Sequence, residues 1–102
     1  MTSRRRVVVT GLGTVNPLGH SVSEYWQALL AGRSGIAPIT LLDTTQFKVK
    51  FGGEVKNFDP AGVIDGRSVR RLDRFGQFAM VAADQAVRDC GLDFAALDPF
   101  RV

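Results

Sequence analysis

The chain contains one thiol, at Cys90, and one imidazole, at His20. A nucleophilic cysteine acts as a thiolate, which a helix N-terminus or a neighbouring cation favours. Cys90 follows Asp89 and is expected at the C-terminal end of a helix, where negative charge on sulfur is disfavoured. The two side chains lie far apart in the sequence, and no further ligand completes a metal-binding spacing. We therefore predict no catalytic residue, no metal site and no cofactor site.

Gly11 and Gly13 follow three consecutive valines, as in a glycine-rich turn that binds a dinucleotide. That fingerprint requires a third glycine three residues later, where this chain has Asn16 followed by Pro17. The next predicted helix begins only after Ser21, so the turn does not lead directly into a helix N-terminus that would hold a pyrophosphate. A tight structural turn is favoured, and a dinucleotide-binding oxidoreductase stays an alternative.

Four arginines lie close together near the start of the longest predicted helix: Arg67, Arg70, Arg71 and Arg74. On one continuous helix they project within an arc of about 100°. Guanidinium groups on a shared face bind phosphate or an acidic protein surface, and a solvated charged face is the ordinary alternative. Phe78 is the one aromatic residue on this arc, so we expect it to face a contact outside this segment and expect no nucleic-acid partner.

Composition restricts the class of protein. The chain has 102 residues, of which 45% are hydrophobic and 23% are charged, as in a folded domain. This excludes a disordered tail, a collagen-like repeat and a disulfide scaffold, and the net charge of +3 is mild. No apolar run approaches the roughly 18 residues of a membrane span, and the run Val7–Val9 is too short for a signal peptide. We expect a cytoplasmic protein without a membrane partner.

Hydrophobic patterning and capping residues predict the elements that position these side chains. In chain order we expect a buried strand over residues 5–10, a glycine loop over 11–19, a helix between Ser21 and Gly32, a loop over 33–45, a strand or hairpin over 47–58, a long helix over about 68–90 ended by Gly91, a helical turn over 93–97 and the start of a strand at 101–102. The order is typical of an α/β protein. One or two strands make too small a sheet for two helices, so we expect an incomplete domain.

Five stretches together carry a family resemblance: Arg5–Gly13, Asn16–Gly19, Trp26–Ile36, Phe47–Phe58 and Arg70–Leu92. They resemble the N-terminus of the β-ketoacyl-acyl carrier protein synthases, and most closely the synthase II type of bacterial fatty acid synthesis. The resemblance covers essentially the whole chain. It implies the thiolase-like fold, in which a mixed sheet lies between flanking helices. Residues 1–102 are then expected to be the N-terminal part of that enzyme's N-terminal domain.

The resemblance implies an acyltransferase that condenses an acyl thioester with malonyl-acyl carrier protein in fatty acid biosynthesis. In this family a cysteine accepts the acyl group, two histidines assist the decarboxylative condensation, and the full-length enzyme is usually a homodimer without metal or cofactor. Neither Cys90 nor His20 matches those residues, so the chain is predicted to be inactive alone. A polyketide ketosynthase and a truncated, non-catalytic carrier-protein-binding module are the open alternatives.

One functional element of the family matches positions of this chain. The family docks its acidic acyl carrier protein on a basic cluster at the start of the long helix, and the matching residues are Arg67, Arg70 and Arg71. Arg74 shares the predicted arc but takes no family role. The resemblance therefore favours docking over a merely solvated face.

Overall fold

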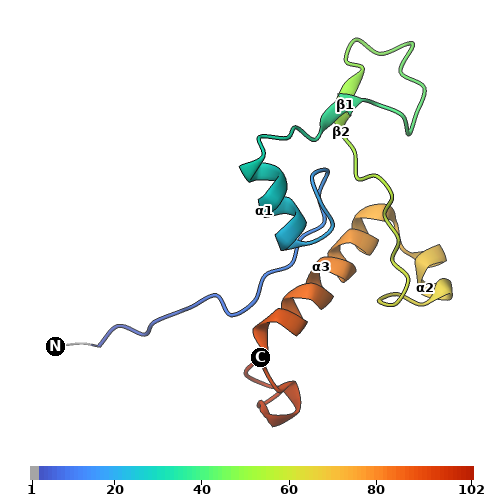
Figure 1. Cartoon of the computed structure of the whole chain (residues 1–102). Helices are drawn as coiled ribbons and strands as arrows, with labels where there is room; N and C mark the ends of the chain where they lie inside the picture. Colours follow the sequence, from blue (N-terminus) through green and yellow to red (C-terminus); the bar gives the residue numbers. More distant parts are fainter. Residues whose placement is uncertain (1–2) are drawn as a thin grey trace.

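The computed structural model describes residues 3–102 (Figure 1). Helices and strands both occur, as the sequence predicts for an α/β chain. In order, the elements are α1 (Val22–Leu30), β1 (Ile36–Pro38), β2 (Phe51–Gly53), α2 (Gly66–Arg71), α3 (Arg74–Cys90) and the 3-10 helix η1 (Phe94–Ala96). The helical turn expected over residues 93–97 is thus confirmed by η1.

The N-terminal segment differs from the prediction. Residues 5–10 form no strand and run away from the helices as an extended chain (Figure 1). Val7 is 94% exposed and Val9 is 78% exposed, so the valine run is not buried. A strand needs a neighbour that accepts its backbone hydrogen bonds, and residues 3–102 place none beside it. Residues 101–102 likewise form no strand.

Helix α1 begins and ends where its capping residues predict. The Ser21 hydroxyl accepts a hydrogen bond from the Glu24 N–H at 3.2 Å, and the Glu24 carboxylate accepts one from the His20 N–H at 2.7 Å. This is a capping box in which the glutamate reaches one residue beyond the N-cap. Gly32 follows the helix with φ of +67°, the left-handed conformation that glycine adopts readily at this position.

The only sheet within residues 3–102 is an antiparallel pair of short strands. Ile36 pairs with Gly53 and Pro38 pairs with Phe51. The strand predicted within residues 47–58 is therefore confirmed over Phe51–Gly53. The loop predicted over residues 33–45 is wrong at β1, where a run of only three residues gives too little alternation to be recognised.

Glu54 closes the connection between the two strands. Its carboxylate accepts hydrogen bonds from the Thr40 N–H at 2.7 Å and the Leu41 N–H at 3.0 Å, and the Ile39 N–H donates to the Lys50 carbonyl at 2.9 Å. The Thr40 N–H, opposed by desolvation and assisted by the Leu41 N–H, holds the pKa of Glu54 below its ordinary value. The carboxylate form thus holds the start of this connection against the end of β2 at neutral pH.

The long helix predicted over residues 68–90 is interrupted. Leu72 is extended, with φ of −99° and ψ of 135°, and separates α2 from α3. Asp65 caps α2 by accepting from the N–H groups of Arg67 and Ser68, each at 3.0 Å. Gly91 ends α3 with φ of +64°, as predicted.

The glycine loop packs directly on α3. A Cβ atom added at Gly11 would lie 2.7 Å from the Cys90 nitrogen, and one added at Gly13 would lie 2.8 Å from the Gln85 Cβ. Two side chains of α3 also hold the loop: Asp89 accepts from the Leu12 N–H at 3.0 Å, and Gln85 accepts from the Thr14 N–H at 3.1 Å. These glycines therefore serve a close approach of backbones.

This contact gives a first prediction. Gly13→Ala should lower the free energy of unfolding by about 1–3 kcal/mol, because the new methyl group has no space against α3. Gly66→Ala is the matched control: no atom lies within 4 Å of an added Cβ there, and alanine favours the helix by up to about 1 kcal/mol. Urea unfolding followed by Trp26 fluorescence measures both. Equal stability of the two variants would contradict the packing.

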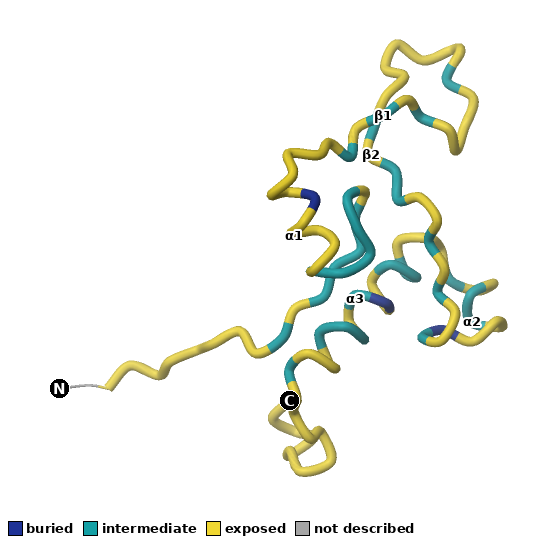
Figure 2. Tube along the Cα trace, in the orientation of Figure 1, coloured by how far each residue is buried: buried dark blue, intermediate teal, exposed yellow. Residues whose placement is uncertain are grey.

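Few residues of the described chain are buried (Figure 2). The buried hydrophobic residues among those described are Ala28, Ile64 and Val81, whereas Phe75 of α3 is 75% exposed. The radius of gyration is 18.1 Å, whereas a compact domain of this length has about 13 Å. The described chain therefore leaves most of its apolar surface uncovered.

Candidate functional site

Three exposed arginines gather on α2. Arg67, Arg70 and Arg71 all lie within this one helix and share an arc of about 100° about its axis. All three are exposed, and the ion pair found within residues 3–102 is elsewhere, between Arg88 and Asp84 at 3.0 Å. Their guanidinium groups therefore have no carboxylate partner in the described chain. We call these three residues the α2 basic cluster.

Arg74 does not belong to this cluster, which corrects the prediction that all four arginines share one face. The chain bends at Leu72, so Arg74 begins a different helix. Its Nη2 donates to the Val55 carbonyl at 2.7 Å, and its guanidinium lies 5.0 Å from the centre of the Phe78 ring. A hydrogen bond and a cation–π contact thus hold this cation within the fold.

Phe78 finds its partner inside the chain, contrary to the prediction that it faces outward. Its ring packs edge-to-face on Phe58, with centroids 4.8 Å apart. Phe58 in turn packs edge-to-face on His20, with centroids 5.9 Å apart. This row of rings joins the start of α1, the segment before α2 and the start of α3, and it gives His20 a packing role.

Asp65 is the acidic residue next to the cluster, and its carboxylate turns to the backbone of α2. The N–H and hydroxyl of Ser68, followed by the Arg67 N–H, hold the pKa of Asp65 below its ordinary value. The cap is therefore fully present above the ordinary carboxyl pKa and is lost only as the pH falls through the lower folded value. At neutral pH Asp65 starts the helix that carries the cluster.

Sequence reasoning missed Gln77, whose side chain joins α2 to α3. Its amide nitrogen donates to the carbonyls of Val69 and Leu72, each at 3.1 Å. One sequence feature could have indicated a break at this point. Asp73, a residue type that commonly precedes a helix, lies inside the predicted long helix and is the N-cap residue of α3.

The structure does not bring Cys90 and His20 together. The Cys90 thiol lies 3.0 Å from the Val87 carbonyl at the C-terminal end of α3, whereas the His20 ring packs on Phe58. Cys90 is only partly buried. Its place at the end of the helix is as predicted.

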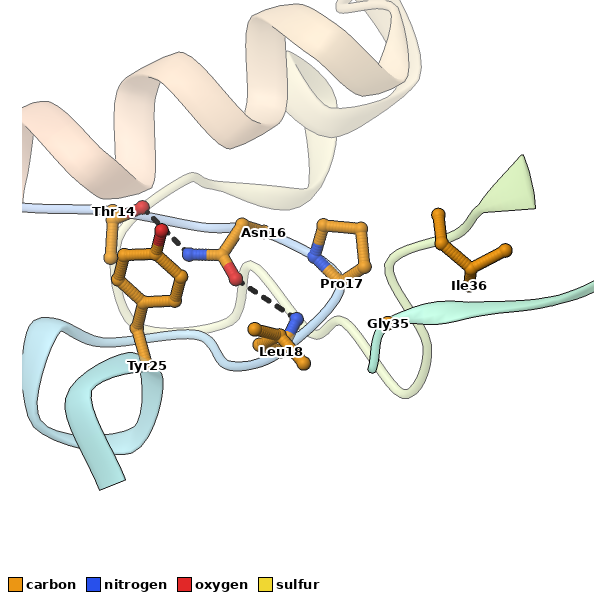
Figure 3. Close-up of a pocket in the computed structure, with 7 residues that line it drawn as sticks. All are labelled: Thr14, Asn16, Pro17, Leu18, Tyr25, Gly35 and Ile36. Atoms are coloured by element: carbon orange, nitrogen blue, oxygen red, sulfur yellow. Dashed lines mark hydrogen bonds between the residues drawn. The ribbon is translucent and has the colours of Figure 1, made fainter. Parts of the chain in front are cut away.

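The loop after the valine run borders a hollow of about 340 Å³ beside α1 (Figure 3). Asn16 shapes the loop: its amide nitrogen donates to the Thr14 hydroxyl and its oxygen accepts from the Leu18 N–H, each at 2.9 Å. The lining is mainly apolar and holds one titratable group, the Tyr25 hydroxyl. Gly11 and Gly13 pack closely against α3, so this side of the glycine turn faces the protein's own helix, which disfavours the dinucleotide alternative.

Within the described residues, α2 therefore presents an exposed basic surface that is suited to an acidic partner. Residues 4–102 match the β-ketoacyl synthase N-terminal domain, and the chain belongs to this family. The α/β arrangement is the N-terminal part of the ketosynthase, thiolase-like fold. It is similar to the solved structure titled "The ishigamide ketosynthase/chain length factor", with a TM-score of 0.81 and 43% identity, covering 93% of this chain and 24% of that one.

Curated relatives are named 3-oxoacyl-[acyl-carrier-protein] synthase 2. The chain is 52% identical over 99 residues to that of Coxiella burnetii, covering 97% of this chain and 24% of the relative. It is 47% identical over 89 residues to that of Synechocystis, covering 87% of this chain and 21% of the relative. The chain thus spans about a quarter of the length of these relatives. Within residues 3–102, no helix is long and apolar enough to cross a membrane.

Proposed function

We propose that residues 1–102 are the N-terminal part of the N-terminal domain of a 3-oxoacyl-[acyl-carrier-protein] synthase. This acyltransferase would condense an acyl thioester with malonyl-acyl carrier protein in fatty acid biosynthesis. The observation that carries the proposal is the 52% identity over 99 residues to the Coxiella burnetii synthase. A cytoplasmic location and a homodimeric assembly, without nucleic acid or membrane partners, belong to the same proposal through the resemblance.

In this proposal the chain contributes carrier-protein binding, and the nucleophile comes from the remaining three quarters of the enzyme. The α2 basic cluster is exposed and has no acidic partner within residues 3–102, which supports a role in docking the acidic acyl carrier protein. Cys90 lies at a helix C-terminus, which does not favour a thiolate nucleophile.

A chimera tests the proposed function. Residues 4–102 would replace the matching segment of the Coxiella burnetii synthase, with the unmodified synthase as the control. We expect condensation of acyl- and malonyl-acyl carrier protein at a rate within about tenfold of the control, because the nucleophile-bearing part is unchanged. A folded chimera without condensing activity would contradict the proposal.

A polyketide ketosynthase is the second candidate, and the ishigamide ketosynthase/chain length factor favours it through its 43% identity and TM-score of 0.81. The two candidates differ in the carrier protein that they use. Competition between a fatty acid carrier protein and a polyketide carrier protein in the same chimera assay separates them. Preference for the polyketide carrier protein would replace the first candidate by the second.

A further inference from the structure

At the C-terminal end of α2, the helix backbone does not supply a hydrogen-bond donor to every carbonyl. Because the chain becomes extended at Leu72, with ψ of 135°, residue 73 cannot donate to the Val69 carbonyl as it would in a continuous helix. The Ser68 carbonyl is still satisfied, by the Leu72 N–H at 3.0 Å. The Val69 and Leu72 carbonyls instead each accept a hydrogen bond from the Gln77 side-chain amide, at 3.1 Å.

Gln77 is well placed to hold α2 rigidly. A primary amide has two N–H donors, and Gln77 uses its amide nitrogen on two acceptors, one within α2 and one at the bend. The backbone N–H of Gln77 donates to the Asp73 carbonyl at 3.0 Å, so the residue is anchored in the first turn of α3. One hydrogen bond would allow α2 to pivot about the bend, whereas two bonds to separated carbonyls fix its direction.

We propose that Gln77 is a positioning residue for carrier-protein docking: it fixes the direction of α2 and thereby the placement of Arg67, Arg70 and Arg71. The inference rests on the proposed function, since it assigns a cause to the geometry of the α2 basic cluster. Charged groups on a helix meet carboxylates of a partner in register only when the helix axis is fixed. Gln77 itself contacts neither the carrier protein nor the reacting groups.

The test uses Gln77→Met in the chimera, because methionine has similar length but no donor. We expect the KM for acyl carrier protein substrates to rise about threefold to tenfold, the range of a lost hydrogen bond. Turnover at saturation and reaction with a small acyl thioester should stay unchanged. Gln77→Asn, which keeps the amide but shortens its reach, carries the same expectation if the methionine variant does not fold.

Gln85→Met is the matched control. Gln85 lies on the same helix and also makes two polar contacts, to the Thr14 N–H and the His20 carbonyl, but neither contact involves α2. Its replacement should destabilise the fold without changing the ratio of carrier-protein to small-thioester activity. A ratio that is unchanged by Gln77→Met, or changed equally by Gln85→Met, would overturn the inference.

The double variant Arg70→Glu/Arg71→Glu, measured alongside, separates the positioning role of Gln77 from carrier-protein docking at α2. If it raises the KM while Gln77→Met does not, the positioning role is wrong and carrier-protein docking stands. If it leaves the KM unchanged, docking at α2 is wrong, and the inference is overturned with it.

Discussion

The 102-residue chain by itself is expected to catalyse acyl transfer and malonyl decarboxylation only at the background rate, at least about 10⁶-fold below a complete synthase. Its single thiol, Cys90, lies at the C-terminal end of α3, where the helix dipole opposes negative charge on sulfur. Its single imidazole, His20, packs against Phe58. The described residues thus do not bring this thiol and this imidazole together.

Product formation from acyl- and malonyl-carrier protein, followed with purified chain and with Cys90→Ala, measures this. Both proteins should match a reaction without protein. Turnover that disappears in Cys90→Ala would assign a catalytic role to this cysteine and refute the expectation.

Charge reversal of the α2 basic cluster gives the second large effect. Arg70→Glu/Arg71→Glu in the chimera should raise the KM for carrier-protein substrates about tenfold to hundredfold at low ionic strength, because two attractive contacts become repulsive. The Debye length falls from about 10 Å at 0.1 M salt to about 3 Å at 1 M, so the effect should shrink as salt is added. Reaction with a small acyl thioester should be largely unchanged.

Arg33→Glu/Arg101→Glu is the control for net charge. Both arginines are exposed and lie outside α2, and the variant has the same net charge as the test variant. It should raise the KM far less. Equal losses of activity with carrier-protein and small-thioester substrates would instead show that the cluster supports the fold. No loss of activity with either substrate would show that the cluster is only a solvated surface.

Sequence reasoning succeeds where the determinants are local. Ser21, Glu24 and Gly32 bound α1 as predicted because each acts on backbone groups a few residues away. The prediction for residues 5–10 is wrong because a strand needs a partner from elsewhere, and valines alone do not supply it.

In the candidate site, too, local features were predicted and features set by distant segments were not. The three arginines of the α2 basic cluster share a face because one short helix holds them, which spacing predicts. Arg74 departs because Val55 and Phe78, on other segments, hold its guanidinium. The bend at Leu72 was missed because the periodic pattern runs through it, and the hydrogen bonds that accommodate it come from the Gln77 side chain.

The hydrogen bonds around the connection between β1 and β2 indicate where insertions and deletions can be tolerated. The Ile39–Lys50 hydrogen bond joins the two ends of the connection between β1 and β2, and Glu54, just after β2, holds Thr40 and Leu41 at the start of this connection. The residues beyond these bonds therefore do not set the register of the strands. Lengthening such a tied loop costs only the slowly growing entropy of loop closure, about 0.6 kcal/mol per doubling. Insertions and deletions should therefore accumulate over residues 42–49, while Glu54 stays tied to the segment that it closes.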